Sequence, residues 1–390
     1  MMKLFDEAER YYQGPAGYGE PEFIYLNRSA IPKVIRIREV LEAWFSRYPG
    51  EGKENLCERF RSTGNLHHRS ALFELFLHEL LLRLGCYVII HPSMDNSIRN
   101  YPYFLVESPD GTSFYMDAVL AIDESVEKIT VRTKMNEVYD VLNRQLNSPN
   151  FFIGMEIRST PQTTPPARNM TTFLTQRLAP LDTVHIASLF EAGGFNALPH
   201  WHYEQEGWRI VFYPIPKSLR YSGKDGVRPL GFLSQKLRWM DPIVPIRDAI
   251  VRKAGRYGDF DLPYVIAVNI LGNHLDRIDI MEALFGKEQL WITRIHSRSI
   301  KTETREPDGV WISKAGPRYR RVSAVLITDT LRSYNVSNAS LWLCHNPWAT
   351  EPYTSVLTRL PQAFLKGDWR RWDCMRWLDG KSLTEIFGLR

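Results

Sequence analysis

The stretch from residue 66 to residue 159 constrains the fold most. The spacing of its apolar residues changes several times between the pattern of a helix and that of a strand. An amphipathic helix is predicted over residues 66–84, and Gly85 follows it where a left-handed cap is expected. Short apolar runs then predict strands, two of them joined by the turn-forming segment SPDG. Residues 123–146 return to helical spacing, and PNFFIGMEIRS predicts another strand. The predicted order is helix, strand, strand, strand, helix, strand.

The rest of the chain also alternates between helical and strand-like texture. Two helices are predicted around residues 169–192 and one over 243–257, and strands are predicted at WHYEQ, WRIVFYPIP, RVSAVLI and SLWLCHN. PYVIAVNI is almost continuously apolar, which is typical of a strand in a sheet covered on both faces. This pattern predicts the α/β class, with a mixed central sheet flanked by helices.

Three regions are expected from this pattern. Residues 1–65 form an N-terminal arm and helices, and residues 66–290 form the core with a helical insertion near 165–195. Residues 291–390 form a C-terminal extension of strands and helices packed on the core. Its Trp-rich tail, KGDWRRWDCMRWLDGKS, is expected to pack as a helical face, although base stacking by the interleaved Trp and Arg side chains is an alternative.

Composition excludes several classes of protein. The 390 residues are 44% hydrophobic and 24% charged, which is ordinary globular usage and not that of a disordered chain. No apolar run is long enough to span a bilayer, and the first residues lack a signal-peptide core. The four cysteines lie far apart, with no zinc-binding or disulfide spacing. We therefore expect a cytoplasmic protein that does not enter the membrane.

The basic residues gather in two segments that Gly and Pro place in loops. The formal net charge is +5, and the clusters lie at KSLRYSGKDGVRPLGFLSQKLR and KAGPRYRR. Such loops are able to follow a phosphate backbone, although an ordinary solvated surface explains either segment equally well. The candidate nucleic-acid-binding residues are Lys217, Arg220, Lys224, Arg228, Lys314, Arg318, Arg320 and Arg321.

The predicted element order resembles the restriction-endonuclease-like, or PD-(D/E)XK, nuclease superfamily. The resemblance includes a Glu on the first helix, the P-x-F strand in NYPYFLVE and an acidic residue on the next strand. It implies an αβββαβ core with N-terminal helical and C-terminal additions. Several segments also resemble a group of bacterial proteins that carry this core: YLNRSA, LFELFLHELLLRLGCYV, YPYFLV…FYMDA, KAGRYGDFDLPYVIAVN and RVSAVLI…NPWA.

In this superfamily, Mg²⁺ on carboxylates polarises the scissile phosphate and activates water. The resemblance places Glu74 at the helix carboxylate and Asp117 at the second-strand acid. Tyr103 stands where an Asp is expected, and Val119 stands where a Lys is expected. A phenol stays protonated near neutral pH, and Val can neither bind a metal nor stabilise charge. Two of the four core positions therefore depart from the motif.

Relocated residues are able to restore such a site. Glu107 lies on the strand next to Asp117, and Lys253 precedes the central strand, from which it could supply a cation. The catalytic candidates are thus Glu74, Asp117 and Lys253, and the metal-binding candidates are Glu74, Glu107 and Asp117. Solvated positions explain Glu107 and Lys253 equally simply.

Three functional hypotheses follow. The first is a nucleic-acid-associated protein with a degraded or rearranged nuclease-like centre, DNA being the expected nucleic acid. The second is an active Mg²⁺-dependent endonuclease that uses Glu74 and Asp117 with relocated partners. The third is a protein-interaction scaffold. Mg²⁺ is expected as a cofactor only in the second, and a homodimer is open in all three. The chain has no dinucleotide, P-loop, hydrolase-elbow or zincin motif.

Overall fold

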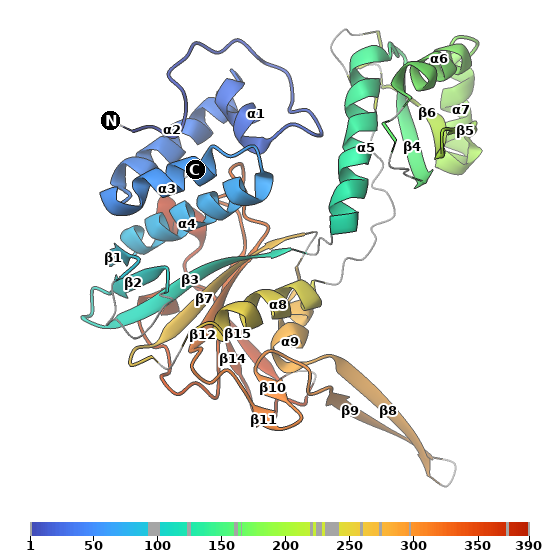
Figure 1. The fold of residues 1–390 in the computed structure, drawn as a ribbon. Coiled ribbons are helices and arrows are strands. Elements are labelled where there is room, and N and C mark those ends of the chain that lie inside the picture. The colour runs from blue at the N-terminus through green and yellow to red at the C-terminus, as the bar shows by residue number, and fades with distance from the viewer. Residues whose placement is uncertain are drawn as a thin grey trace. The chain divides into compact units, whose positions relative to one another are not determined.

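The computed structural model divides the chain into two compact units (Figure 1). Unit 1 comprises Met1–Gly14, Pro21–Asp123 and Met240–Arg390, and unit 2 comprises Pro15–Glu20 and Glu124–Trp239. Within them the structure describes residues 2–92, 102–122, 126–159, 163–164, 166–218, 221–223, 228–230, 242–257, 260–272, 275–295, 298–371 and 374–388. Each unit has a hydrophobic core of its own.

Unit 1 begins with helices that pack on one another. They are α1 (Glu22–Arg28), α2 (Pro32–Arg47), α3 (Gly50–Phe60) and α4 (Asn65–Arg83). α2 starts with a proline at its first turn, where no backbone N–H is needed. α4 is buried along most of its length, and the chain leaves it through Gly85 at a φ of 89°. The predicted helix and the left-handed glycine after it are confirmed.

Next come three antiparallel strands, β1 (Tyr87–Ile90), β2 (Phe104–Glu107) and β3 (Ser113–Ile122). The SPDG segment forms the β2–β3 turn, in which the N–H of Ser108 donates to the carbonyl of Thr112 over 2.8 Å. Gly111 takes a φ of 82° there, a conformation that a residue with a Cβ rarely adopts. The predicted hairpin is therefore confirmed.

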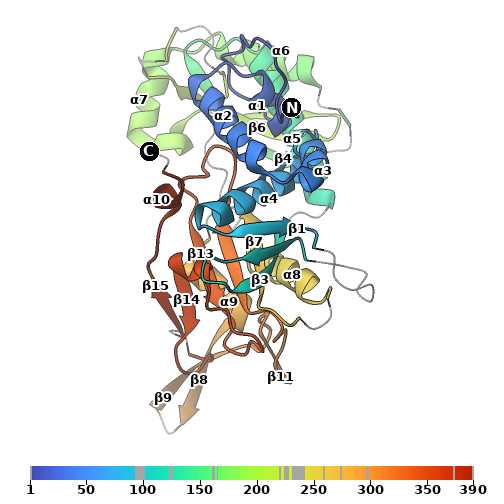
Figure 2. The ribbon, with the colours of Figure 1, turned by 90° about the vertical axis from the view of Figure 1, so that its left-hand side faces the viewer.

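These strands open a sheet of eight strands in the order β1-β2-β3-β7-β12-β13-β14-β15. Its centre is parallel: β7 (Tyr264–Leu271) pairs with β3 on one side and with β12 (Ala324–Asp329) on the other. Every residue of β7 is buried, as its apolar sequence predicts. Helix α4 packs on one face, and α8 (Ile243–Ala254) and α9 (Arg277–Phe285) pack on the other (Figures 1 and 2).

The helix and strand that follow β3 in sequence do not complete this sheet. Residues 126–159 form α5 (Val126–Gln145) and β4 (Phe151–Ser159), which belong to unit 2. The place next to β3 is taken instead by β7, which α8 precedes. The prediction that residues 66–159 form one contiguous core is therefore wrong. An amphipathic helix and a half-apolar strand fit either sheet, so the pattern alone does not choose between them.

Unit 2 contains a three-stranded antiparallel sheet in the order β4-β6-β5. Trp208 and Phe212 of β6 are fully buried, in a cluster with side chains of α5 and of the helix over residues 167–178. The insertion into unit 1 therefore extends far beyond the helical segment expected near residues 165–195. Its remaining elements are α6 (Ala167–Leu178), α7 (Thr183–Gly193), η1 (Gly194–Ala197), β5 (Trp201–Gln205) and β6 (Trp208–Pro216).

The C-terminal third is part of the central sheet and not an extension packed on it. The Trp-rich tail, expected as a helical face, instead contributes the edge strand β15. Two separate two-stranded ribbons, β8–β9 and β10–β11, project from the same unit. The remaining elements are β8 (Glu288–Ile295), β9 (Arg298–Arg305), β10 (Ile312–Ser313), β11 (Gly316–Pro317), β13 (Leu341–His345), η2 (Val356–Arg359), β14 (Gln362–Leu365), β15 (Met375–Leu378) and α10 (Leu383–Phe387).

Two global expectations concern the membrane and the cysteines. Across the described residues, no helix combines the length and the apolar character needed to cross a bilayer. All four cysteines are buried free thiols: Cys57, Cys86, Cys344 and Cys374. The fold is thus a mixed α/β architecture with a large mixed sheet flanked by helices.

Candidate functional site

Asp117 lies in the middle of β3. It follows Met116, the β3 residue that pairs with the first residue of β2. Phe104 pairs with Met116, and on the other side Asp117 pairs with Ile266 of β7. Side chains alternate along a strand, so Asp117 shares the α8 face with Tyr115 and Val119. The residue is only 2% exposed. The sheet therefore holds this carboxylate beneath α8 in an apolar layer.

Both carboxylate oxygens of Asp117 receive protein donors. Lys253 Nζ lies 3.0 Å from Oδ1, and its side chain is 15% exposed. The phenols of Tyr257 and Tyr264 donate to Oδ2 over 2.6 and 3.2 Å. Burial and the nearby Asp117 charge raise the pKa of both phenols, so both remain protonated donors. Charge-assisted bonds of this kind are stronger than neutral ones, and together they neutralise the buried charge.

The elements explain why these groups meet. Lys253 lies in the last turn of α8, and Tyr257 follows just after the helix ends. Tyr264 opens β7 and pairs with Tyr115, two residues before Asp117. The structure thus brings together two of the predicted candidates, Asp117 and Lys253, and adds two tyrosines that sequence reasoning missed. The segment KAGRYGDFDLPY carries them, but its aromatic residues are equally typical of ordinary core packing.

Glu74 belongs to a different cluster, on the opposite face of the sheet. It lies in α4, and both of its oxygens accept from the Arg59 guanidinium over 2.9 and 2.5 Å. Burial opposes the charge on Arg59, but Glu74 outweighs this effect and raises the pKa of the guanidinium. The geometry is that of a bidentate ion pair between α3 and α4. This ion pair is enough to explain why the largely buried helix α4 carries a carboxylate.

Tyr103, at the position where the motif has an Asp, joins the Glu74 cluster. Its hydroxyl lies 3.0 Å from the Tyr48 hydroxyl and accepts from Arg59 over 3.3 Å. Burial, followed by the charge of Glu74, raises the pKa of Tyr103, so the phenol stays neutral. Val119, at the position of the motif lysine, is buried in the core beneath α8. Both departures from the motif are thus packing residues.

The carboxylates predicted to share a metal ion are therefore not brought together. Glu74 lies on the α4 face and Asp117 on the α8 face, while Glu107 is exposed at the far end of β2, paired with Ser113. Over the residues that the structure describes, no group of three or more His, Cys, Asp or Glu side chains is arranged to hold a metal. Mg²⁺ requires several oxygen ligands, and Asp117 already faces an ammonium and two phenols. These residues do not fit the ion.

Two residues of the first basic segment are engaged inside unit 2. Lys217 is 8% exposed, and its ammonium donates to the carbonyl of Ser148 over 2.7 Å. Burial lowers the pKa of Lys217. Arg228 donates to the carbonyl of Ala16 and lies over the Tyr18 ring. Neither residue is an exposed phosphate contact. Arg220 and Lys224 lie outside the described residues.

The second basic segment is more exposed. Residues 312–317 form the β10–β11 ribbon, with Lys314 exposed at its turn. Arg318 donates to the carbonyls of Val310 and Gly309, both over 2.9 Å. Arg320 is exposed, and its Nε donates to the carbonyl of Trp348 over 3.1 Å. The backbone thus holds both Arg318 and Arg320 in place.

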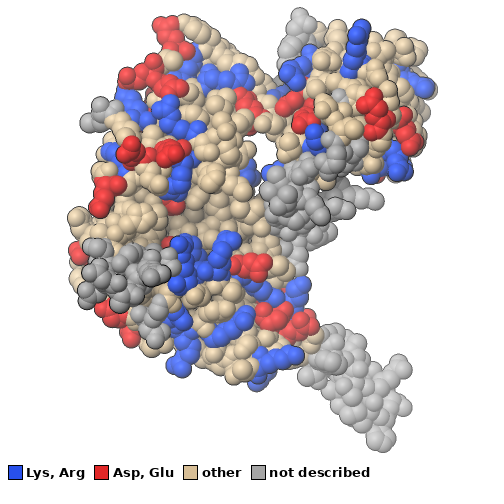
Figure 3. All heavy atoms as spheres, in the orientation of Figure 1, with Lys and Arg blue, Asp and Glu red and all other residues tan. Residues whose placement is uncertain are grey.

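Arg321 connects this segment to the end of α8. Its guanidinium donates to the carbonyl of Tyr257, whose phenol binds Asp117. Arg252 and Arg256 are exposed at the same end of α8. We call the exposed cations at the end of α8 and in the second basic segment the basic surface: Arg252, Arg256, Lys314 and Arg320. Figure 3 shows several Lys and Arg side chains in the α8 region of unit 1, with Asp and Glu side chains among them.

Sequence reasoning did not select Arg252 or Arg256, although RKAGR holds three cations in five residues. Comparison of the chain with known protein families, characterised proteins and solved structures finds no match.

Proposed function

We propose that the chain is a nucleic-acid-binding protein on a restriction-endonuclease-like core, in which an ion pair replaces the hydrolytic centre. The observation that carries the proposal is the position of the Asp117–Lys253 pair directly beside the basic surface. The expected nucleic acid is duplex DNA.

The element order supports the finer fold assignment. In unit 1 the sheet and its flanking helices follow the order α4, β1, β2, β3, α8, β7, with unit 2 inserted between β3 and α8. This is the αβββαβ order of the superfamily with a large insertion. Asp117 occupies the strand expected for the second acid, and the strand next to it in the sheet, β7, is parallel to β3.

The contacts of Asp117 favour a structural role over hydrolysis. A catalytic carboxylate in this superfamily needs oxygen atoms that are open to Mg²⁺. Here Lys253, Tyr257 and Tyr264 occupy the carboxylate, and the residue is 2% exposed. Removing one partner of such a buried pair leaves an uncompensated charge, which costs roughly 3–5 kcal/mol. The pair thus links α8 to β3, and loss of either partner alone would destabilise that junction.

The charge of the basic surface supports binding to phosphates. Its cations come from two segments, the end of α8 and residues 314–321, which the hydrogen bond from Arg321 to the Tyr257 carbonyl holds to each other. Each cation that neutralises a phosphate releases a counterion, which makes the affinity strongly dependent on salt. Four such contacts correspond to a loss of roughly 100-fold between about 50 and 200 mM salt.

The test is fluorescence anisotropy with a 20-base-pair duplex over this salt range. We expect measurable binding at low salt, with the steep decline given above. Arg252→Ala combined with Arg256→Ala should reduce the slope of log K against log salt by about 2, because two phosphate contacts are lost. The matched control is Lys33→Ala combined with Arg36→Ala, an exposed pair on α2, which should leave the slope unchanged.

Contrary outcomes distinguish the other hypotheses. Absence of binding at low salt would refute the proposal and leave the protein-interaction scaffold. Cleavage of the duplex with Mg²⁺ or Mn²⁺ that Asp117→Asn abolishes would instead establish an active nuclease.

A further inference from the structure

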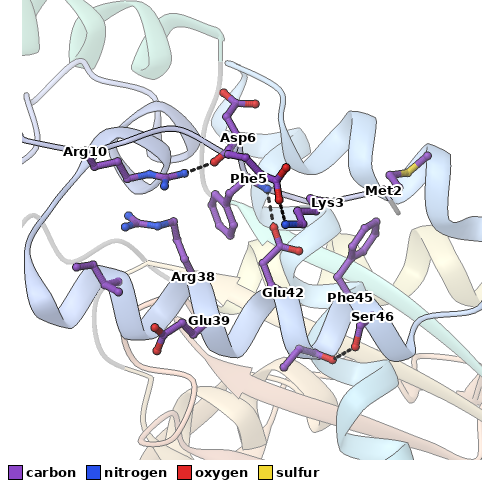
Figure 4. Close-up of a pocket in the computed structure, with 13 residues that line it drawn as sticks. Met2, Lys3, Phe5, Asp6, Arg10, Arg38, Glu39, Glu42, Phe45 and Ser46 are labelled. Atoms are coloured by element: carbon purple, nitrogen blue, oxygen red, sulfur yellow. Dashed lines mark hydrogen bonds and ion pairs between the residues drawn. The ribbon is translucent and has the colours of Figure 1, made fainter.

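A cavity of about 540 Å³ lies in unit 1 between the N-terminal arm and α2 (Figure 4). Phe5, Ile35 and Phe45 contribute apolar surface to its wall. Charged side chains from the arm and from α2 complete the lining. Such a mixture of apolar wall and a few polar groups is typical of small-molecule sites.

Arg38 is the unusual residue of this cavity. It is 7% exposed, and its Nη1 donates to the carbonyls of Leu26 and Ser29 over 2.6 and 2.8 Å. Over the described part of the chain, its Nε and Nη2 groups have no hydrogen-bond partner, and no carboxylate forms an ion pair with it. Burial and the neighbouring Arg10 charge lower the pKa of Arg38, and the charge of Glu39 partly opposes this shift. A buried cation without a counterion is costly, so this edge of the guanidinium is suited to an anion.

Arg10 adds a second, fixed positive charge. It donates to the carbonyls of Asn27, Ala8 and Asp6, which holds the arm in place. In Figure 4 the Arg10 and Arg38 side chains lie close together. Like charges in this position repel each other, and an anion beside them would relieve the repulsion.

The acidic side chains of the cavity are largely engaged elsewhere. Glu42 accepts from the N–H of Phe5 over 2.8 Å, and Glu7 pairs with Lys3. Asp6 binds Asn27 and Arg61. Glu39 extends in another direction from the Arg38 guanidinium (Figure 4). Among the described residues, none of these acids forms an ion pair with Arg38, although the charge of Glu39 acts on it from a distance.

We propose that this cavity binds a small organic anion with an apolar body. Its carboxylate or phosphate accepts hydrogen bonds from the free edge of Arg38, and its apolar part packs on Phe5, Ile35 and Phe45. The site is distinct from the basic surface and does not depend on nucleic-acid binding.

Isothermal titration of the full chain with octanoate, octyl phosphate, inorganic phosphate and octyltrimethylammonium tests the proposal. We expect octanoate or octyl phosphate to bind; the stronger of the two identifies the head group. Inorganic phosphate should bind more weakly because it lacks the apolar body, and the cation should not bind. Failure of both octyl anions to bind would overturn the proposal.

Substitutions on α2 separate a binding site from a merely structural arginine. Ile35 lies one turn before Arg38, and long helical side chains lean toward the N-terminus, so Ile35→Glu supplies a built-in counterion. We expect it to weaken anion binding about tenfold or more, equal to about 1.4 kcal/mol. The size-matched Ile35→Gln should have a much smaller effect, and Glu39→Gln should tighten binding. Equal affinity in Ile35→Glu and Ile35→Gln would refute the role of Arg38, with circular dichroism confirming that both are folded.

Discussion

In the described part of unit 1, the three buried carboxylates each lie beside a cation from another element. Asp117 on β3 meets Lys253 of α8, and Glu74 on α4 meets Arg59 of α3. Glu79, also on α4, receives Arg47 from α2. A buried charge without such a partner is strongly unfavourable. The acids of α4 therefore connect helices to one another, although the sequence made one of them, Glu74, a candidate metal ligand.

His78 is a buried histidine that should make the stability of the fold depend on pH. It is 1% exposed, and its Nδ1 has no hydrogen-bond partner among the described residues. Burial lowers its pKa to about 4. Because the folded-state pKa lies below the unfolded value of about 6.5, only the unfolded state takes up a proton as the pH falls between these values. Because of His78, the free energy of unfolding should thus fall by about 3 kcal/mol as the pH falls from about 6.5 to about 4.

Urea unfolding between pH 4 and pH 7 measures this effect. His78→Phe keeps a ring next to Tyr48 and should flatten the acid side of the stability profile. Part of the slope should remain, because burial also lowers the pKa of His68. Replacement of the exposed His202 by Gln is the control and should not alter the profile. An identical acid slope in the His78→Phe variant would contradict the prediction.

Two glycines that end helices differ in their surroundings. Gly286 closes α9 at a φ of 104°, and an added Cβ would lie 1.8 Å from the carbonyl oxygen of Glu306. Gly388 closes α10 at a φ of 63°, and no atom of the described residues lies within 4 Å of an added Cβ. Gly388→Ala should therefore cost only the left-handed strain of about 1–2 kcal/mol. Gly286→Ala must also displace backbone, so we expect a cost above about 3 kcal/mol.

Thermal unfolding of the two alanine variants tests this difference. The Gly286 variant should melt well below the Gly388 variant. Equal melting temperatures would contradict the prediction, because they would show that the backbone at Glu306 moves aside with no loss of stability.

Individual elements were predictable where local signals determine them. Gly85 and Gly286 mark helix ends, and SPDG marks a hairpin, because glycine allows a positive φ that other residues avoid. Pairing between strands was not predictable in the same way. β4 has apolar residues that suit either sheet, and only long-range contacts place it beside β6. The tail gave helical spacing, yet its residues form β15 because the edge of β14 is available to pair with them.

The candidate site shows the same limit. Lys253 was named as a candidate because its helix precedes the central strand, whereas the resemblance itself placed the lysine at Val119. The opposite orientation of Glu74 was not predictable, because it depends on which face of the sheet α4 covers. Tyr257 and Tyr264 became recognisable only when α8 and β7 were placed against β3.

At the scale of the whole molecule, the two units have separate cores, which predicts separable stabilities. Trp208 is fully buried in unit 2, and Trp311 is fully buried in unit 1. Trp208→Ala should cost unit 2 about 3–5 kcal/mol through the cavity it leaves. Hydrogen exchange followed by mass spectrometry should then show faster exchange in β4, β5 and β6 and unchanged exchange in β7. Trp311→Ala should show the reverse, and parallel loss of protection in both units would contradict independent cores.

The insertion of unit 2 between β3 and α8 also has a consequence for biosynthesis. β3 ends at Ile122, and its parallel neighbour β7 begins only at Tyr264. At roughly 5–20 residues per second, a ribosome takes roughly 7 to 28 s to make the intervening chain. During that interval one edge of a largely apolar strand has no partner, while unit 2 emerges and is able to fold. Nascent chains of this protein should therefore depend on chaperones until β7 has left the ribosome.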